Sequence, residues 1–161
     1  MQVAAIVGHQ GSGKTTLIER LIQVARERGL AVSTIKHTHH HDIELDTPGK
    51  DSYRHRVAGA AEVIVASDTG WARIAASAAP ADLKFLLGQL RPVDLVLVEG
   101  FKQLEWLRRV EVFRGAGAPL AQADPGIAAV AVPAGFSLTG CQGIELPLDD
   151  PSAVLDFILS G

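Results

Sequence analysis

The sequence contains little cysteine, few aromatic residues and no large excess of charge. Cys141 is the single cysteine among 161 residues. It cannot form an internal disulfide, which fits a reducing compartment. Aromatic residues make up 5 % of the chain, so the core must be built mostly from Val, Ile, Leu and Ala. The net charge of −3 offers no argument for binding nucleic acid or an anionic membrane surface.

Long apolar segments are also missing. The first residues, MQVAAIVGHQ, lack the basic start and the longer apolar run of a signal peptide. No apolar run approaches the ~20 residues that a helix needs to cross a bilayer. We therefore expect a cytoplasmic protein without a membrane or nucleic-acid partner, folded as a single domain over residues 1–161.

What the sequence does contain is an alternation of strand and helix patterns. Residues 3–7 are a continuous apolar run, typical of a strand buried on both faces of a parallel sheet. The next segment has apolar side chains at helical spacing and ends at Gly29. This alternation predicts one α/β domain with a mostly parallel sheet. Further strands are predicted at 31–35, 61–66, 71–75, 94–100, 110–113 and 127–132, and further helices at 52–60, 82–90 and 150–159.

One motif is far more specific than the rest. Residues 8–15, GHQGSGKT, match G-x-x-x-x-G-K-[ST], with a predicted strand before them and a predicted helix after them. In such a loop, backbone N–H groups and the helix N-terminus surround a phosphate. We predict that Lys14 reaches the β- and γ-phosphates and that the Thr15 hydroxyl binds Mg²⁺. The fold class becomes a three-layer P-loop NTPase-like fold. The predicted nucleotide-binding residues are Gly8, His9, Gln10, Gly11, Ser12, Gly13, Lys14, Thr15 and Thr16.

A magnesium site of this kind usually needs an acidic residue at the end of another strand. The segment DLVLVEG offers Asp94 and Glu99. Ligands gather at the carboxyl ends of parallel strands, where Glu99 lies, while Asp94 is about 16 Å upstream. We therefore predict that Thr15 and Glu99 form the metal site and that Asp94 is a solvated strand start.

The segment KHTHHHD, at residues 36–42, holds four of the six histidines. If the sheet is parallel, the loop that follows leaves from the same edge as the phosphate loop and Glu99. Three roles remain open for it: a metal site, a solvated loop, or recognition of an anionic ligand or of a partner that carries one. The histidines lack the fixed ligand spacing of a zinc site, which favours the third role.

Three segments together point to a family: GHQGSGKTTL, TIKHTHHHDIELDTPGKDSYRHRVAGA and DLVLVEGFK. This combination resembles the molybdopterin-guanine dinucleotide biosynthesis adaptor family, MobB, over about the first 115 residues. The middle segment is the most restrictive of the three, because phosphate loops occur in many unrelated enzymes.

The resemblance implies a GTP-binding P-loop protein, often a homodimer, with Mg²⁺ and with slow hydrolysis at most. It implies that the protein assists the guanylyltransferase that joins GMP to molybdopterin. Molybdopterin or its guanine dinucleotide becomes a candidate ligand, and proteins that load molybdopterin become further candidate partners. The resemblance also implies a ligand or partner loop beside the nucleotide, for which the candidate residues are His37, His39, His40, Asp46, Lys50, Asp51 and Arg54.

The sequence departs from many GTPases in having no N/T-K-x-D guanine motif, so guanine specificity is implied by the resemblance alone. The strand pattern GIAAVAVPAGF ends in Pro133 and Ala134, where an acidic residue is expected in those proteins. Two other functions stay open. One is a metallochaperone GTPase that uses the histidines for nickel or zinc, and the other is a small-molecule kinase. The single distant cysteine argues against the first, and the lack of an arginine-rich lid argues against the second.

Overall fold

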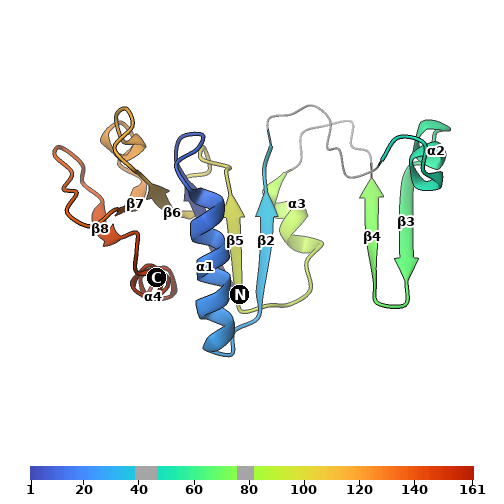
Figure 1. The fold of residues 1–161 in the computed structure, drawn as a ribbon, viewed down its shortest axis with the longest axis horizontal. Coiled ribbons are helices and arrows are strands. Elements are labelled where there is room, and N and C mark those ends of the chain that lie inside the picture. Colours follow the sequence, from blue (N-terminus) through green and yellow to red (C-terminus); the bar gives the residue numbers. More distant parts are fainter. Residues whose placement is uncertain (39–46, 76–81) are drawn as a thin grey trace. The chain divides into compact units, whose positions relative to one another are not determined.

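The computed structural model describes residues 1–38, 47–75 and 82–161. The chain folds into two compact units (Figure 1). The first combines Met1–His37 with Leu86–Gly161, and the second is Thr38–Phe85.

The first unit is built on a six-stranded sheet in the order β2-β5-β1-β6-β7-β8. Each neighbouring pair of these strands is parallel. This arrangement confirms the predicted P-loop NTPase-like α/β fold with a mostly parallel central sheet. The strands are β1 (Gln2–Val7), β2 (Val32–Lys36), β5 (Leu95–Glu99), β6 (Arg108–Val112), β7 (Ile127–Val132) and β8 (Ile144–Pro147).

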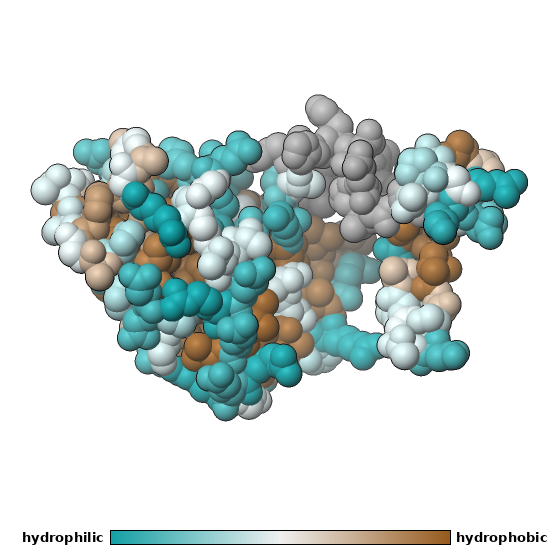
Figure 2. Space-filling model, viewed as in Figure 1, coloured by the Kyte–Doolittle hydropathy of each residue, from teal (hydrophilic) through white to brown (hydrophobic). Residues whose placement is uncertain are grey.

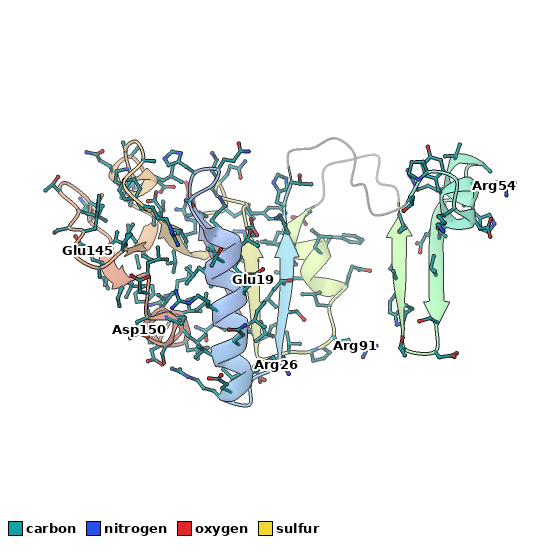
Figure 3. All side chains as sticks on the ribbon, in the orientation of Figure 1. Glu19, Arg26, Arg54, Arg91, Glu145 and Asp150 are labelled. Atoms are coloured by element: carbon teal, nitrogen blue, oxygen red, sulfur yellow. The ribbon has the colours of Figure 1, made fainter. Side chains whose placement is uncertain are left out.

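Two helices, α1 (Lys14–Glu27) and α4 (Pro151–Leu159), pack together against one face of this sheet (Figure 1). Alternate strand residues such as Ile6, Leu97 and Val110 contribute to the core beneath them. The start of α4 is well defined, because the Asp150 carboxylate accepts hydrogen bonds from the backbone N–H groups of Ser152 and Ala153 (Figure 3).

The residues that alternate with this core face the other side of the sheet and are buried as well, and they include two charged side chains. Arg109 and Glu111, both on β6, are 1 % and 0 % exposed. The Glu111 carboxylate accepts hydrogen bonds from the N–H groups of Leu120 and Ala121, at 2.7 and 2.9 Å, and so holds the start of the 3₁₀ helix η1 (Leu120–Gln122). Arg109 forms an ion pair with Asp124, and its hydrogen bond lowers the pKa of that carboxyl.

The second unit contains α2 (Asp51–Val57) and the antiparallel pair of β3 (Glu62–Ser67) and β4 (Gly70–Ala75). The pair confirms the two strands predicted at residues 61–66 and 71–75. Ile64, Val65 and Trp71 on this pair are 62 %, 46 % and 61 % exposed. Brown, apolar atoms are accordingly visible over the hairpin in Figure 2. A short helix, α3 (Leu83–Gly88), spans the boundary between the units in sequence.

The helix predicted at residues 52–60 is α2, which begins at Asp51 and ends at Val57, and its N-cap residue, Lys50, makes no side-chain cap hydrogen bond. The sequence pattern did not reveal β8, because its four residues include Glu145 and Pro147 and do not form an apolar run. Within the described parts of the chain, no helix has the length and apolar character needed to span a bilayer.

Candidate phosphate-binding site

The loop at residues 8–15 connects β1 to α1, as the motif predicts. Gly8 has a φ of +143°, and a Cβ atom there would lie 2.6 Å from the backbone oxygen of Val112. Gly13 is the N-cap of α1 with a φ of +96°. Both positions therefore require glycine, because any side chain would clash or force the backbone into a strained conformation. The tight turn that these two glycines allow leads the chain directly into the first turn of α1.

Lys14 lies against the backbone of the loop itself. Its ammonium group donates hydrogen bonds to the carbonyl oxygens of Gly8 and His9, at 3.1 and 2.8 Å. Burial lowers the pKa of Lys14, Glu99 raises it, and the nearby cations Lys36 and Lys102 lower it further. The amine is thus held in a crowded cationic environment, which an anionic ligand would relieve.

Glu99 lies beside Thr15, 84 residues away in sequence. The Thr15 hydroxyl donates to both carboxylate oxygens of Glu99, each at 3.2 Å. Lys36 forms an ion pair with the same carboxylate, with its Nζ atom 3.5 Å from Oε1. Asp94, by contrast, lies at the opposite end of β5, where its carboxylate accepts a hydrogen bond from the N–H of Ala31. Asp94 is therefore an exposed residue at a strand start, as predicted, and its carboxylate also links the starts of β5 and β2, whereas Glu99 is the acidic residue next to the loop.

The residues of the loop fit a nucleotide phosphate chain with Mg²⁺. The Ser12 hydroxyl oxygen is buried and has no hydrogen-bond partner within the described residues. Such an unsatisfied group is costly unless a ligand or water supplies a partner. Thr15 and Glu99 supply hydroxyl and carboxylate oxygens, which are the ligand types that Mg²⁺ prefers. A bound Mg²⁺ would neutralise charge on the phosphate oxygens.

The β6 side of the loop carries a residue that the sequence analysis missed. The Arg114 side chain packs against the loop, because a Cβ atom on Gly13 would lie 3.1 Å from its Nε atom. A ring nitrogen of His9 is 2.9 Å from the carbonyl oxygen of Ala118. The small cavity between these segments encloses about 80 Å³. This is well below the ~300 Å³ of a typical ligand pocket, so this cavity by itself would not hold a nucleotide.

The candidate residues of the histidine segment are distributed over both units. His37 follows β2 in the first unit; its N–H donates to the Glu99 carbonyl oxygen at 2.9 Å, and its ring lies 4.7 Å from that of Phe101. Lys50, Asp51 and Arg54 belong to the second unit, at the start of α2. There Arg54, labelled in Figure 3, pairs with Asp51 at 3.6 Å, and both side chains are exposed.

His39, His40 and Asp46 lie outside the described residues. Over residues 1–38, 47–75 and 82–161, there is no group of three or more His, Cys, Asp and Glu side chains placed to hold a metal ion. The described residues thus add nothing in favour of the nickel or zinc hypothesis.

The parallel sheet and the glycine-rich loop before α1 define a P-loop NTPase-like α/β protein. A family profile described as "Molybdopterin guanine dinucleotide synthesis protein B", or MobB, matches residues 3–133. The chain belongs to this family.

Individual relatives agree with this assignment. The chain is 48 % identical over 100 residues to the molybdopterin-guanine dinucleotide biosynthesis adapter protein of Haemophilus influenzae, covering 61 % of this chain and 56 % of that protein. It is 46 % identical over 118 residues to the Escherichia coli protein of the same name, covering 70 % and 66 %. The matches thus span between half and two thirds of these relatives' lengths.

A solved structure extends the likeness over nearly the whole chain. The crystal structure of Bacillus subtilis MobB superimposes with a TM-score of 0.75 and 30 % sequence identity, covering 99 % of this chain and 97 % of that one. The fold therefore matches that of a MobB protein beyond residue 115, where the sequence motifs end.

Proposed function

We propose that this protein binds GTP with Mg²⁺ at the loop of residues 8–16 and acts as an adaptor in the synthesis of molybdopterin guanine dinucleotide. The observation that carries the proposal is the pair of hydrogen bonds from the Thr15 hydroxyl to the Glu99 carboxylate. Thr15 is the residue directly after Lys14 in the phosphate loop. This contact brings a hydroxyl and a carboxylate to one point, as a magnesium–nucleotide site requires. The choice of guanine rests on family membership, since the sequence lacks the N/T-K-x-D motif.

The adaptor role follows from the names of the relatives, which are adapter proteins of this pathway. In this role the protein would assist a guanylyltransferase, and it would also contact proteins that load molybdopterin. The proposed ligand or partner loop contains His37, His39, His40, Asp46, Lys50, Asp51 and Arg54, and the candidate ligand is molybdopterin or its guanine dinucleotide. Hydrolysis is proposed to be slow, because the sequence shows no recognisable water-activating glutamine.

Calorimetric titration of the full chain with GTP, ATP and molybdopterin guanine dinucleotide tests this function. We expect Mg²⁺-dependent binding of GTP, weaker binding of ATP, and binding of the dinucleotide. Replacing Glu99 by glutamine is expected to reduce the Mg²⁺ dependence, because an amide is a poorer magnesium ligand than a carboxylate. Tighter binding of ATP than of GTP, without any binding of the dinucleotide, would contradict the adaptor role.

We also propose that the protein is a homodimer and that the β3–β4 hairpin contributes to the interface. Ile64 and Trp71 lie on one face of the hairpin, because Ile64 is paired with Arg73 and Trp71 with Ala66, and both expose large apolar side chains. A second copy presents the same surface, so an interface with twofold symmetry would cover both hairpins at once.

Replacing Ile64 by glutamate is therefore expected to shift the protein from dimer to monomer, since a buried unpaired charge destabilises an interface. Sedimentation or light scattering over a range of concentrations measures the change. Ile144→Glu is the matched control, because Ile144 is 57 % exposed but lies on the edge strand β8 of the first unit. A monomeric wild-type protein, or dissociation by Ile144→Glu alone, would contradict the role of the hairpin.

A further inference from the structure

Lys36 is the last residue of β2 and lies directly beside Glu99 on the neighbouring strand. The two residues are partners in the parallel register of β2 and β5. The Lys36 Nζ atom lies 3.5 Å from Glu99 Oε1. The lysine side chain is 63 % exposed, whereas the glutamate side chain is only 14 % exposed. The carboxylate is therefore fixed, and the ammonium group is free to move on its long stem.

The Glu99 carboxylate serves two neighbours at once, because Thr15 donates to both of its oxygens while Lys36 forms the ion pair. Thr15 and Glu99 are also the residues that fit Mg²⁺. A divalent cation next to this carboxylate would repel the Lys36 ammonium group at close range. In the loaded site, the exposed Lys36 ammonium group would move away from the metal, towards solvent or towards another anion within its reach.

The side of the sheet on which Lys36 lies indicates which anion this is. Glu99 and Lys36 are the last residues of β5 and β2, on one side of β1, whereas Arg114 follows β6 on the other side. In P-loop proteins Mg²⁺ bridges oxygens of the β- and γ-phosphates. The γ-phosphate is consequently expected on the Glu99 side of the loop, within reach of Lys36.

We propose that Lys36 contacts the terminal phosphate of a bound nucleoside triphosphate, so that the protein distinguishes a triphosphate from a diphosphate. This inference rests on the proposed nucleotide-binding function and assigns the selection of the triphosphate to one side chain. Lys36 would exchange its ion pair with Glu99 for an ion pair with the phosphate. Lys14, which contacts the loop carbonyls of Gly8 and His9, would serve both nucleotides.

The test compares the affinities of the full chain for a non-hydrolysable GTP analogue and for GDP, both with Mg²⁺, by calorimetry. In Lys36→Gln and Lys36→Met, we expect the affinity for the triphosphate to fall about 10- to 100-fold, as for the loss of a charge-assisted contact. The affinity for GDP should change by less than about threefold, since no contact to it is lost. Lys36→Arg retains the charge and should stay close to wild type.

Lys102→Gln is the matched control. Lys102 is a second cation that acts electrostatically on Lys14, but it forms no ion pair with Glu99 within the described residues. Its replacement should lower the affinities for both nucleotides by a similar small factor. Circular dichroism of each variant verifies that the fold is intact.

Three results would overturn the proposal. Equal losses for both nucleotides in Lys36→Gln would mean that Lys36 only positions Glu99. Unchanged affinities would mean that Lys36 plays no part in binding. A selective loss in Lys102→Gln, without one in Lys36→Gln, would assign the role to Lys102. Binding of neither nucleotide by the wild-type protein would instead refute the proposed function itself.

Discussion

Replacing Lys14 by alanine is expected to weaken GTP affinity about 30- to 1000-fold, which corresponds to roughly 2–4 kcal/mol. In the structure, the Lys14 ammonium group donates to the carbonyl oxygens of Gly8 and His9. A bound triphosphate would offer it charged oxygens in their place, and hydrogen bonds between charged groups are about twice as strong as neutral ones. Calorimetry with GTP and Mg²⁺ measures the loss.

Arg26→Ala is the control for this prediction, because it removes a positive charge from the same helix (Figure 3). Arg26 lies twelve residues further along α1, about 18 Å away at ~1.5 Å per residue. Its replacement should leave the GTP affinity close to wild type, since exposed charges at this distance are largely screened. Wild-type affinity in Lys14→Ala would refute the assignment of the phosphate loop.

Replacing Glu111 by leucine is expected to lower the free energy of unfolding by roughly 3 kcal/mol or more. The Glu111 side chain is fully buried and accepts hydrogen bonds from the N–H groups of Leu120 and Ala121. Leucine is similar in size but cannot accept a hydrogen bond, so both donors would lose their partner. Each unsatisfied buried donor costs about 1–3 kcal/mol.

Urea denaturation measures this change as a lower midpoint at an unchanged slope. Glu111→Gln keeps one acceptor oxygen and should cost about half as much. Glu145→Leu is the matched control, because Glu145 accepts one backbone N–H at 2.8 Å but is exposed (Figure 3). Its replacement should cost less than about 1 kcal/mol, since water can replace the lost acceptor. An equal loss in Glu111→Leu and Glu145→Leu would show that burial of Glu111 does not matter.

Most of the fold follows from local pattern. The run at residues 3–7, the glycine-rich loop and the amphipathic segment after it predict β1, the phosphate loop and α1, and the structure contains them in that order. Asp150 and Pro151 are residues typical of a helix start, and α4 begins there. The strand β8 was missed because its pairing partner is β7, so its stability comes from the sheet and not from its own apolar pattern.

The charged core of the first unit was not predictable in the same way. Arg109 and Glu111 are part of the polar segment KQLEWLRRVEVFRG, of which only residues 110–113 are predicted to form a strand. In the structure both are buried on β6, because Asp124 and the start of η1 supply their partners from further along the chain. The pattern of the segment itself does not predict hydrogen-bond partners that lie 9 to 15 residues away in the sequence.

The sequence by itself determined which residues form the glycine-rich loop: the glycines, Lys14 and Thr15 are contiguous, and the roles proposed for them rest on backbone geometry within one short turn. It also indicated Glu99, because the carboxyl ends of parallel strands share one edge of the sheet. Only the tertiary structure decided that Lys36 pairs with Glu99 and that Arg114 lies against Gly13. These contacts depend on which strands are neighbours and in which register, and both are set by packing between residues far apart in the chain.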